Sequence, residues 1–169
     1  EMCIRDSSLP EGEDAEALLQ PAIKKILTAA GDYCYGIDVP DLQTAAVQAL
    51  RKKGLTVAAA ESCTGGLVAA RLTEVPGASA VFGCGIVSYN NTVKAEVLGV
   101  DPAIIEQYTA VSAETAAAMA EAVRKKSGAD IGIGVTGNAG PSASEGQPVG
   151  LVFVAVASEK YSHVSRLFI

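Results

Sequence analysis

The apolar run LTVAAA at residues 55–60 constrains the fold more than any other feature of this chain. It is short and uniformly apolar, which is typical of a strand buried on both faces of a parallel sheet. Such a strand needs a layer of helices on each side, because neither of its faces can be left to water. The chain around this run should therefore form an α/β sheet that is covered by helices on both faces.

The chain from residue 41 onward supports this prediction. Apolar periodicity with polar caps and glycine stops predicts helices at residues 41–53, 65–72, 91–98 and 112–127, and a short helix that starts at Asp101 and Pro102. We expect Asn91 and Ser112 to be N-caps of two of them. Further apolar segments predict strands at residues 82–89, 130–136, 149–157 and 163–168. Because such sheets bind ligands beyond the C-terminal ends of their strands, a site is expected in the loops after Ala60, Tyr89 and Thr136.

Composition narrows the class of function. With 169 residues, of which 49% are hydrophobic and 19% charged, the chain suits one domain, or one domain with an attached segment. A net charge of −6 disfavours nucleic acid as a partner, and no apolar run approaches the roughly 18 residues of a membrane span. Four cysteines without CxxC spacing and a single histidine predict no metal site. These features are typical of a reduced, cytoplasmic protein.

Residues 1–40 differ from the remainder of the chain. The first eight, EMCIRDSS, have no periodicity, and we interpret them as a non-native leader. Residues 9–40 predict a helix that ends near Ala30 and then a linker rich in turn formers. Pro21 should either begin this helix or kink it.

The first loop at the expected C-terminal edge of the sheet is ESCTGG at residues 61–66. Ser62 would lie between a strand end and a helix start, beside N–H groups of Thr64, Gly65 and Gly66 that have no intrahelical partner. Such donors favour a substrate phosphate or the oxyanion of acyl transfer. The alternative is a capped turn in which Ser62 or Thr64 only satisfies helix N–H groups.

A nucleophilic serine needs a base, and the second loop, SYNNTVK at residues 88–94, supplies a candidate. The one histidine, His163, falls in a predicted strand, so a Ser-His-Asp arrangement is poorly supplied. Burial can lower the pKa of a lysine until it acts as a base, and Lys94 lies with Tyr89 at the same edge as Ser62. The alternative is that Lys94 is an ordinary exposed helix lysine.

The third loop, TGNAGP at residues 136–141, is rich in glycine. Gly137 and Gly140 flank a short turn, which suits close approach of the backbone to a ligand. A glycine-rich connection without a ligand is the alternative. The chain has no Walker pattern, and no GxGxxG opens a helix after the first strand, so neither a P-loop nor a dinucleotide fold is indicated.

Six motifs occur in order: AESCTGG, VPGAS, VSYNNTVKAEVLGV, AVSAETAAAMA, TGNAGP and QPVG. Together they resemble the CinA C-terminal domain family, which is similar to the nicotinamide mononucleotide amidohydrolases (PncC). The resemblance covers residues 41–169 and implies a three-layer α/β/α sandwich with a mixed, mostly parallel sheet. Residues 9–40 then look like the segment that joins this domain to a preceding domain of the same polypeptide.

The same resemblance implies hydrolysis of nicotinamide mononucleotide to nicotinic acid mononucleotide and ammonia. Ser62 would be the nucleophile and Lys94 its neutral general base, while Tyr89 would relay or hold the proton. The substrate-binding positions that the resemblance implies are Glu61, Thr64, Gly65, Gly66, Asn91, Thr136, Gly137 and Gly140. It implies a pyridine nucleotide substrate, a homo-oligomer, and neither a metal nor an organic cofactor. Cys63 stands at the same helix start, and a cysteine nucleophile is therefore an open alternative.

Two departures from the family pattern bear on function. Asn138 stands where the family more often has an apolar residue, which affects ligand contacts in that loop. The sequence stops at SRLFI, whereas family members continue into a G-D-R segment, with a substrate-binding arginine, and a closing helix. We therefore expect apolar sheet surface to face water, and weak activity. The alternative function is a non-catalytic module that supports oligomerisation or the partner domain of a CinA protein.

Overall fold

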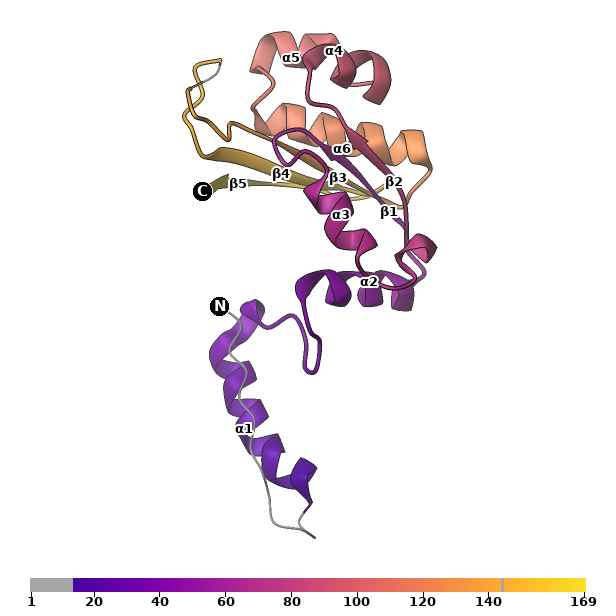
Figure 1. The fold of residues 1–169 in the computed structure, drawn as a ribbon, viewed down its shortest axis with the longest axis vertical. Helices are drawn as coiled ribbons and strands as arrows, with labels where there is room; N and C mark the ends of the chain where they lie inside the picture. The colour runs from indigo at the N-terminus through magenta and orange to yellow at the C-terminus, as the bar shows by residue number, and fades with distance from the viewer. Residues whose placement is uncertain (1–13, 144) are drawn as a thin grey trace. The chain divides into compact units, whose positions relative to one another are not determined.

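The structure, a computed structural model, describes residues 14–143 and 145–169. The chain divides into two units, Glu1–Pro40 and Asp41–Ile169, which are drawn together in Figure 1. The interpretation of residues 1–8 as a leader lies outside the described residues.

The first unit consists of the helix α1 (Ala15–Ala30) and the 3-10 turn η1 (Gly31–Tyr33). Pro21 lies inside α1 and so does not begin it, which excludes the first of the two predicted alternatives. The side chains of Leu18 and Ile26 are exposed although α1 has the apolar periodicity of a packed helix.

The second unit is built on a five-stranded sheet in the order β2-β1-β3-β4-β5. Strand β1 pairs in parallel with β2 and with β3, β4 is antiparallel to β3, and β5 is antiparallel to β4. Four of the strands therefore point one way and β4 runs against them, which confirms the mixed, mostly parallel sheet. The strands are β1 (Val57–Glu61), β2 (Phe82–Val87), β3 (Ile131–Gly137), β4 (Leu151–Ala157) and β5 (Ser162–Phe168).

Helices cover both faces of this sheet, as Figure 1 shows. The helices α2 (Leu42–Lys53) and α3 (Leu67–Thr73) lie on one face, with the 3-10 turn η2 (Ala78–Ala80). The other face carries α6 (Ala113–Ser127) together with α4 (Asn91–Val93), the π-helical turn η3 (Lys94–Leu98) and α5 (Pro102–Tyr108). The predicted three-layer α/β/α sandwich is therefore confirmed.

The central strand β1 is buried along its whole length, as the run LTVAAA predicts. Its side chains alternate between two cores, with Val57 and Ala59 packed toward α2 and α3 and Ala58 and Ala60 packed toward α6. By this period of two, Glu61 at the strand end faces α3, and the next residue turns to the opposite side. The alternation thus directs the side chain of Glu61 to one face of the sheet and that of Ser62 to the other.

Close packing of α6 on β3 depends on two glycines. A Cβ atom at Gly132 or Gly134 would collide with backbone atoms of Ala120, and at Gly134 also with the carbonyl of Ala116. The absence of a side chain therefore lets α6 approach the sheet closely enough to fix the loop that precedes the helix.

The predicted helix ends are mostly correct. Ser112 caps α6 by accepting a hydrogen bond from the N–H of Thr115, and Gly99 ends η3 in the left-handed conformation. The prediction of Asn91 as an N-cap is wrong, because Asn90 has the extended backbone of a cap and its side chain accepts from Thr92 N–H at 2.8 Å. Asn91 is already helical, so its side chain is free to point elsewhere.

The strand order places a crevice between β1 and β3. The chain leaves β1 through α3 to reach β2 on one side, whereas β3 lies on the other side of β1 and is reached over the opposite face. Connections that diverge in this way open a space beyond the carboxyl ends of the two strands. Ser62 directly follows β1 and Asn138 directly follows β3, so both lie at this switch point.

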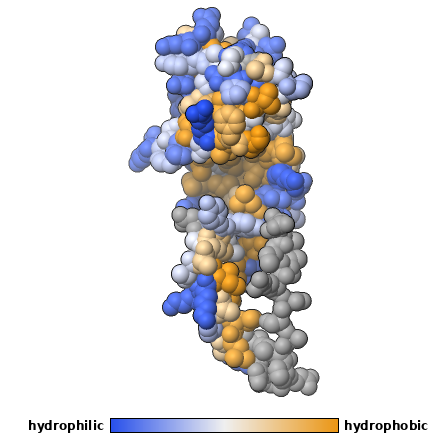
Figure 2. Space-filling model, turned by 90° about the vertical axis from the view of Figure 1, so that its left-hand side faces the viewer, coloured by the Kyte–Doolittle hydropathy of each residue, from blue (hydrophilic) through white to orange (hydrophobic). Residues whose placement is uncertain are grey.

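The side of the sheet away from α6 is incompletely covered at β4 and β5. Phe153 and Ala155 pack against α6, and the alternate residue Val156 is 37% exposed on the opposite face. Leu167 on β5, which pairs with Val152, is 45% exposed. In Figure 2, hydrophobic residues gather across the middle of the face in view. The expectation that apolar sheet surface faces water is confirmed.

Candidate active site

The loop that follows β1 is held from inside by the carboxylate of Glu61. Its Oε2 accepts hydrogen bonds from the N–H groups of Gly66 and Val68 at 3.1 and 3.0 Å, and its Oε1 accepts one from Ala69 at 2.8 Å. The side chain is 1% exposed. Glu61 therefore satisfies the free N–H groups at the start of α3, and the structure does not bring it into the ligand cavity.

This arrangement corrects the expected set of free donors around Ser62. The N–H of Gly66 is occupied by Glu61, and that of Gly65 donates to the carbonyl of Ser62 at 3.1 Å. Within the described part of the chain, the N–H groups of Cys63 and Thr64 have no oxygen acceptor. Both act to lower the pKa of the Cys63 thiol, so they face the space beside that side chain. Cys63 lines the cavity whereas Thr64 does not, so the N–H of Cys63 is the donor of this pair that an oxyanion near Ser62 could reach.

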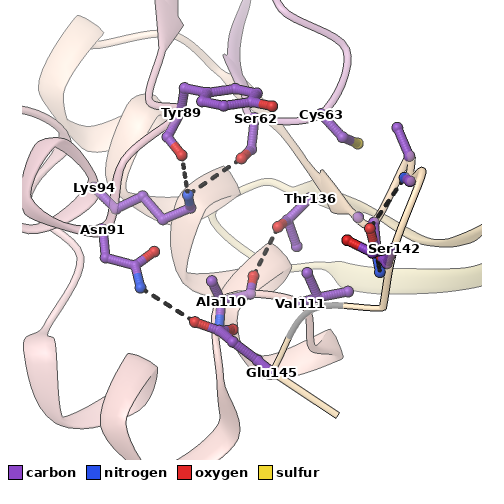
Figure 3. A pocket seen from close by; sticks show the side chains of 14 residues that line it. Ser62, Cys63, Tyr89, Asn91, Lys94, Ala110, Val111, Thr136, Ser142 and Glu145 are labelled. Atoms are coloured by element: carbon purple, nitrogen blue, oxygen red, sulfur yellow. Dashed lines mark hydrogen bonds between the residues drawn. The ribbon is translucent and has the colours of Figure 1, made fainter. Parts of the chain in front are cut away.

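Lys94 is buried beside Ser62, which excludes an ordinary exposed lysine. Its side chain is 1% exposed, and Nζ lies 3.2 Å from Oγ of Ser62. Nζ also donates to the carbonyl of Ser88 at 2.9 Å. A third contact, which Figure 3 shows with that to Ser62, goes to the carbonyl of Tyr89 at 3.5 Å. Burial lowers the pKa of Lys94, while the charges of Glu145 and of Cys63 raise it to a smaller extent.

The partners of Nζ fit a neutral amine as well as an ammonium, whose three N–H groups would donate to Ser62, Ser88 and Tyr89. A neutral amine has two N–H groups and one lone pair, and the carbonyls of Ser88 and Tyr89 can accept only from the N–H groups. The lone pair is then left for the hydroxyl of Ser62, which can donate to it. No ion pair with Lys94 occurs among the described residues, so a buried ammonium charge there is offset only in part, by charges such as that of Glu145 that are not in contact with it. A neutral Lys94 amine in this position can therefore accept the proton of the Ser62 hydroxyl.

Tyr89 contacts this pair through its backbone and not through its hydroxyl. The carbonyl of Tyr89 accepts from Lys94, whereas its side chain is 76% exposed and forms no hydrogen bond in the described part of the chain. Figure 3 shows the ring beside Ser62 at the edge of the cavity. A proton relay through the hydroxyl therefore stays a prediction, and the ring is placed to contact a ligand.

Cys63 also lines the cavity, and burial raises the pKa of its thiol. A thiol with a raised pKa forms less of the nucleophilic thiolate at neutral pH. The hydrogen bond from Lys94 goes to Ser62. The local chemistry thus favours Ser62 over Cys63 as the nucleophile.

A cavity of about 300 Å³ opens in front of Ser62 and Lys94. It lies at the C-terminal edge of the sheet and is bounded by the three loops that the sequence singles out. The predicted site residues that line it are Ser62, Tyr89, Asn91, Lys94, Thr136, Gly137 and Gly140. Thr64, Gly65 and Gly66 are not among the lining residues, because they turn away with the start of α3. The volume is at the lower end of the range for small-molecule sites.

The loop after β3 is fixed by polar side chains that are themselves buried. The hydroxyl of Thr136 donates to the carbonyl of Ala110 at 2.7 Å. Asn138 donates through its amide to the carbonyls of Ser142 and Gln147, both at 3.1 Å, and accepts from Gly140 N–H at 3.1 Å. The asparagine that departs from the family pattern therefore holds this loop closed on itself, which a buried side-chain amide is suited to do.

Glu145 is a lining residue that the sequence analysis missed. Its Oε2 accepts from Ala110 N–H at 2.7 Å, and its Oε1 accepts from the amide of Asn91 at 3.4 Å. These contacts join the third loop to the two other sides of the cavity. This loop has no hydrophobic periodicity, so the sequence does not indicate that the carboxylate of Glu145 lines the cavity.

The described residues contain neither a candidate cluster of metal ligands nor a helix that could span a membrane. Residues 14–143 and 145–169 contain no cluster of three or more histidine, cysteine or carboxylate groups that could ligate a metal ion. None of the helices in these ranges has the length and apolar character that are needed to cross a bilayer.

Relatives of the chain share its sequence over most of its length. A CinA-like protein of Desulfovibrio desulfuricans is 45% identical over 159 residues, which are 93% of this chain and 37% of that protein. A CinA-like protein of Dictyoglomus turgidum is 44% identical over 145 residues, or 85% of this chain and 35% of that protein. The chain spans about two-fifths of the length of the curated relatives that it matches.

Solved structures share the fold and part of the sequence. The competence/damage inducible protein CihA from Agrobacterium tumefaciens superposes with a TM-score of 0.71 at 38% identity, covering 75% of this chain and 78% of that one. A CinA superfamily protein from Escherichia coli gives a TM-score of 0.74 at 29% identity, covering 83% and 85%. The CinA C-terminal domain model matches residues 40–169. On this evidence the chain belongs to the CinA C-terminal domain family.

Proposed function

We propose that the second unit is an amidohydrolase that converts nicotinamide mononucleotide to nicotinic acid mononucleotide and ammonia. The contact between Lys94 Nζ and Ser62 Oγ at 3.2 Å, in a buried position without a carboxylate partner in the described residues, carries this proposal. A buried lysine beside a serine hydroxyl is a recognised substitute for the histidine base of other acyl-transfer enzymes. The six sequence motifs favour the carboxamide of a pyridine nucleotide as the bond that is cleaved.

The reaction can be written with the groups in place. Neutral Lys94 takes the proton of Ser62 while Oγ attacks the carboxamide carbon. The oxyanion accepts from the N–H group of Cys63. Lys94 then returns the proton to the leaving nitrogen, and ammonia departs. Water, deprotonated by the same amine, hydrolyses the ester and releases the carboxylate and free Ser62.

Glu61 has a positioning role in this mechanism. It fixes the turn that carries Ser62, because it ties the end of β1 to the first turn of α3. The nucleophile is thus held between a buried strand and a capped helix, and its Oγ keeps its distance from Lys94 without help from the ligand.

Ammonia release from nicotinamide mononucleotide tests the proposal. The unmodified chain should release ammonia, Ser62→Ala should abolish release, and Cys63→Ala should retain it. Activity that survives Ser62→Ala and is lost in Cys63→Ala would replace the serine by the cysteine. If the unmodified, folded chain releases no ammonia, the non-catalytic module is favoured, a function to which the exposed apolar face of β4 and β5 is suited.

A further inference from the structure

We propose, building on the proposed function, that the cavity selects a ligand ring that carries positive charge. Glu145 and the ring of Tyr89 would recognise this charge. The nicotinamide ring is a pyridinium cation when its nitrogen is bonded to ribose, and it is neutral in nicotinamide itself and in the reduced, dihydro form of the nucleotide. Ring charge is therefore a property by which the site can separate otherwise similar amides.

The charges around the cavity favour a cation. Lys94 is the only basic residue among the described residues that line it, and the neutral form is the one that serves as base. Glu145 is the only carboxylate of the same set. With Lys94 neutral, the lining residues carry a net negative charge, which attracts a cationic ring and gives a neutral ring no such advantage.

Glu145 is held so that its carboxylate stays at the cavity. Ala110 N–H binds one oxygen at 2.7 Å and the amide of Asn91 binds the other at 3.4 Å. Ala110 is fixed in turn through its carbonyl, which accepts from Thr136. Two neutral donors satisfy part of the carboxylate without cancelling its charge, so the charge remains available to a ligand.

Tyr89 offers a second group that prefers a cation. Its exposed ring lines the cavity on the side of Ser62, and Figure 3 shows Glu145 on the opposite side. The face of a tyrosine ring attracts cations by its quadrupole. A ring whose carboxamide reaches Ser62 has its nitrogen meta to that group, two ring bonds away, inside the cavity of about 300 Å³ that Glu145 also lines.

The decisive measurement compares two ligands that differ only in the ring, which is an aromatic cation in one and a neutral ring with one added hydride in the other. The oxidised and the dihydro forms of nicotinamide mononucleotide have the same amide, ribose and phosphate. Their dissociation constants can be measured by calorimetry on the Ser62→Ala chain, which prevents turnover. We expect the oxidised form to bind about tenfold more tightly, as one partly screened charge pair would give.

Glu145→Gln, added to Ser62→Ala, should reduce this ratio to about two- to threefold. Glutamine keeps an oxygen for Ala110 N–H and removes the charge, and its NH₂ group can donate to Asn91 once the Asn91 amide turns to present its oxygen. Glu96→Gln is the matched control, because Glu96 lies in the adjacent hollow with Glu145 but does not line the cavity of Ser62. It should leave the ratio unchanged.

Three outcomes would overturn the inference: equal binding of the two forms, a ratio unaffected by Glu145→Gln, or an equal effect of Glu96→Gln. Failure of the proposed function is separate, since it would appear as no ammonia release by the unmodified chain whatever the binding ratio. Tyr89→Leu should lower the ratio further, because a leucine side chain has no quadrupole.

Discussion

The buried carboxylate of Glu61 should be one of the largest single contributions to the stability of the sheet edge that carries Ser62. It accepts three backbone hydrogen bonds from the start of α3 and is almost fully buried. We predict that Glu61→Gln, a substitution of nearly the same shape, destabilises the second unit by about 2–3 kcal/mol. The expected loss follows from the individual hydrogen bonds.

A glutamine has one acceptor oxygen where glutamate has two. If this oxygen takes the place of Oε2, it still accepts from Gly66 and Val68. Each of these two hydrogen bonds is then neutral, and its contribution to stability falls from ~1.5–3 to ~0.5–1.5 kcal/mol. The NH₂ group then faces Ala69 N–H, so one bond is lost and two donors oppose each other. The smaller desolvation cost of the neutral amide offsets part of this loss.

Urea unfolding of the two chains measures the effect, and Asp41→Asn is the matched control. Asp41 is also a carboxylate that caps a helix, but it accepts from one N–H group, that of Thr44, and asparagine is as good a cap. The control should unfold close to the midpoint of the unmodified chain. If Glu61→Gln costs no more than Asp41→Asn, the three hydrogen bonds do not hold the loop and the positioning role of Glu61 is wrong.

Three further predictions concern the base, the helix packing and the exposed sheet face. Lys94→Arg should lose nearly all turnover, because a guanidinium cannot deprotonate; an arginine variant active within a few-fold would make Lys94 only an electrostatic anchor. Gly134→Ala should destabilise by about 2–3 kcal/mol in urea unfolding, since its Cβ meets α6 backbone, whereas Gly83→Ala on β2 has open space and should not. Leu167→Lys should weaken self-association in sedimentation and change unfolding by less than about 0.5 kcal/mol, because this side chain is half exposed; unchanged association would exclude this face as its cause.

The fold could be predicted because its local signals agree with its packing. The run at residues 55–60 is apolar on both faces and becomes the fully buried β1. Ser112 and Gly99 have the side chain and the backbone freedom that their helix ends require. Asn90 and Asn91 have the same side chain, and either could cap the helix. The backbone conformation at the end of β2 determines that Asn90 is the cap.

The site could be predicted where it depends on strand ends and not where it depends on side-chain direction. Ser62 and Lys94 are 32 positions apart and meet because two parallel strands end at one edge. The resemblance implies that Glu61 binds substrate, but the alternation of β1 turns its side chain toward α3. This alternation is visible in the sequence. Glu145 reaches Asn91 across 54 positions from an irregular loop, and no periodicity indicates that contact.

The pH dependence of activity tests Lys94 as a neutral base. Burial lowers the pKa of Lys94 below its usual 10.5, while Glu145 and, to a smaller extent, the thiolate form of Cys63 act in the opposite direction. Only the neutral amine can take the proton of Ser62, so kcat/KM should rise with pH through the lowered pKa and be level above it. Glu145→Gln removes a negative charge that raises this pKa, and the acid limb should move to lower pH.

The same pKa shift makes a second, independent prediction about stability. The unfolded chain keeps the Lys94 proton up to about 10.5, whereas the folded chain releases it at a lower pH. Between these values the unfolded state binds more protons, so the free energy of unfolding rises with pH in that window. Lys94→Met has no proton to release and should lose this part of the dependence. For the activity profile, Lys94 is not the base if the acid limb of kcat/KM lies at or above pH 10.5, or if Glu145→Gln moves that limb to higher pH.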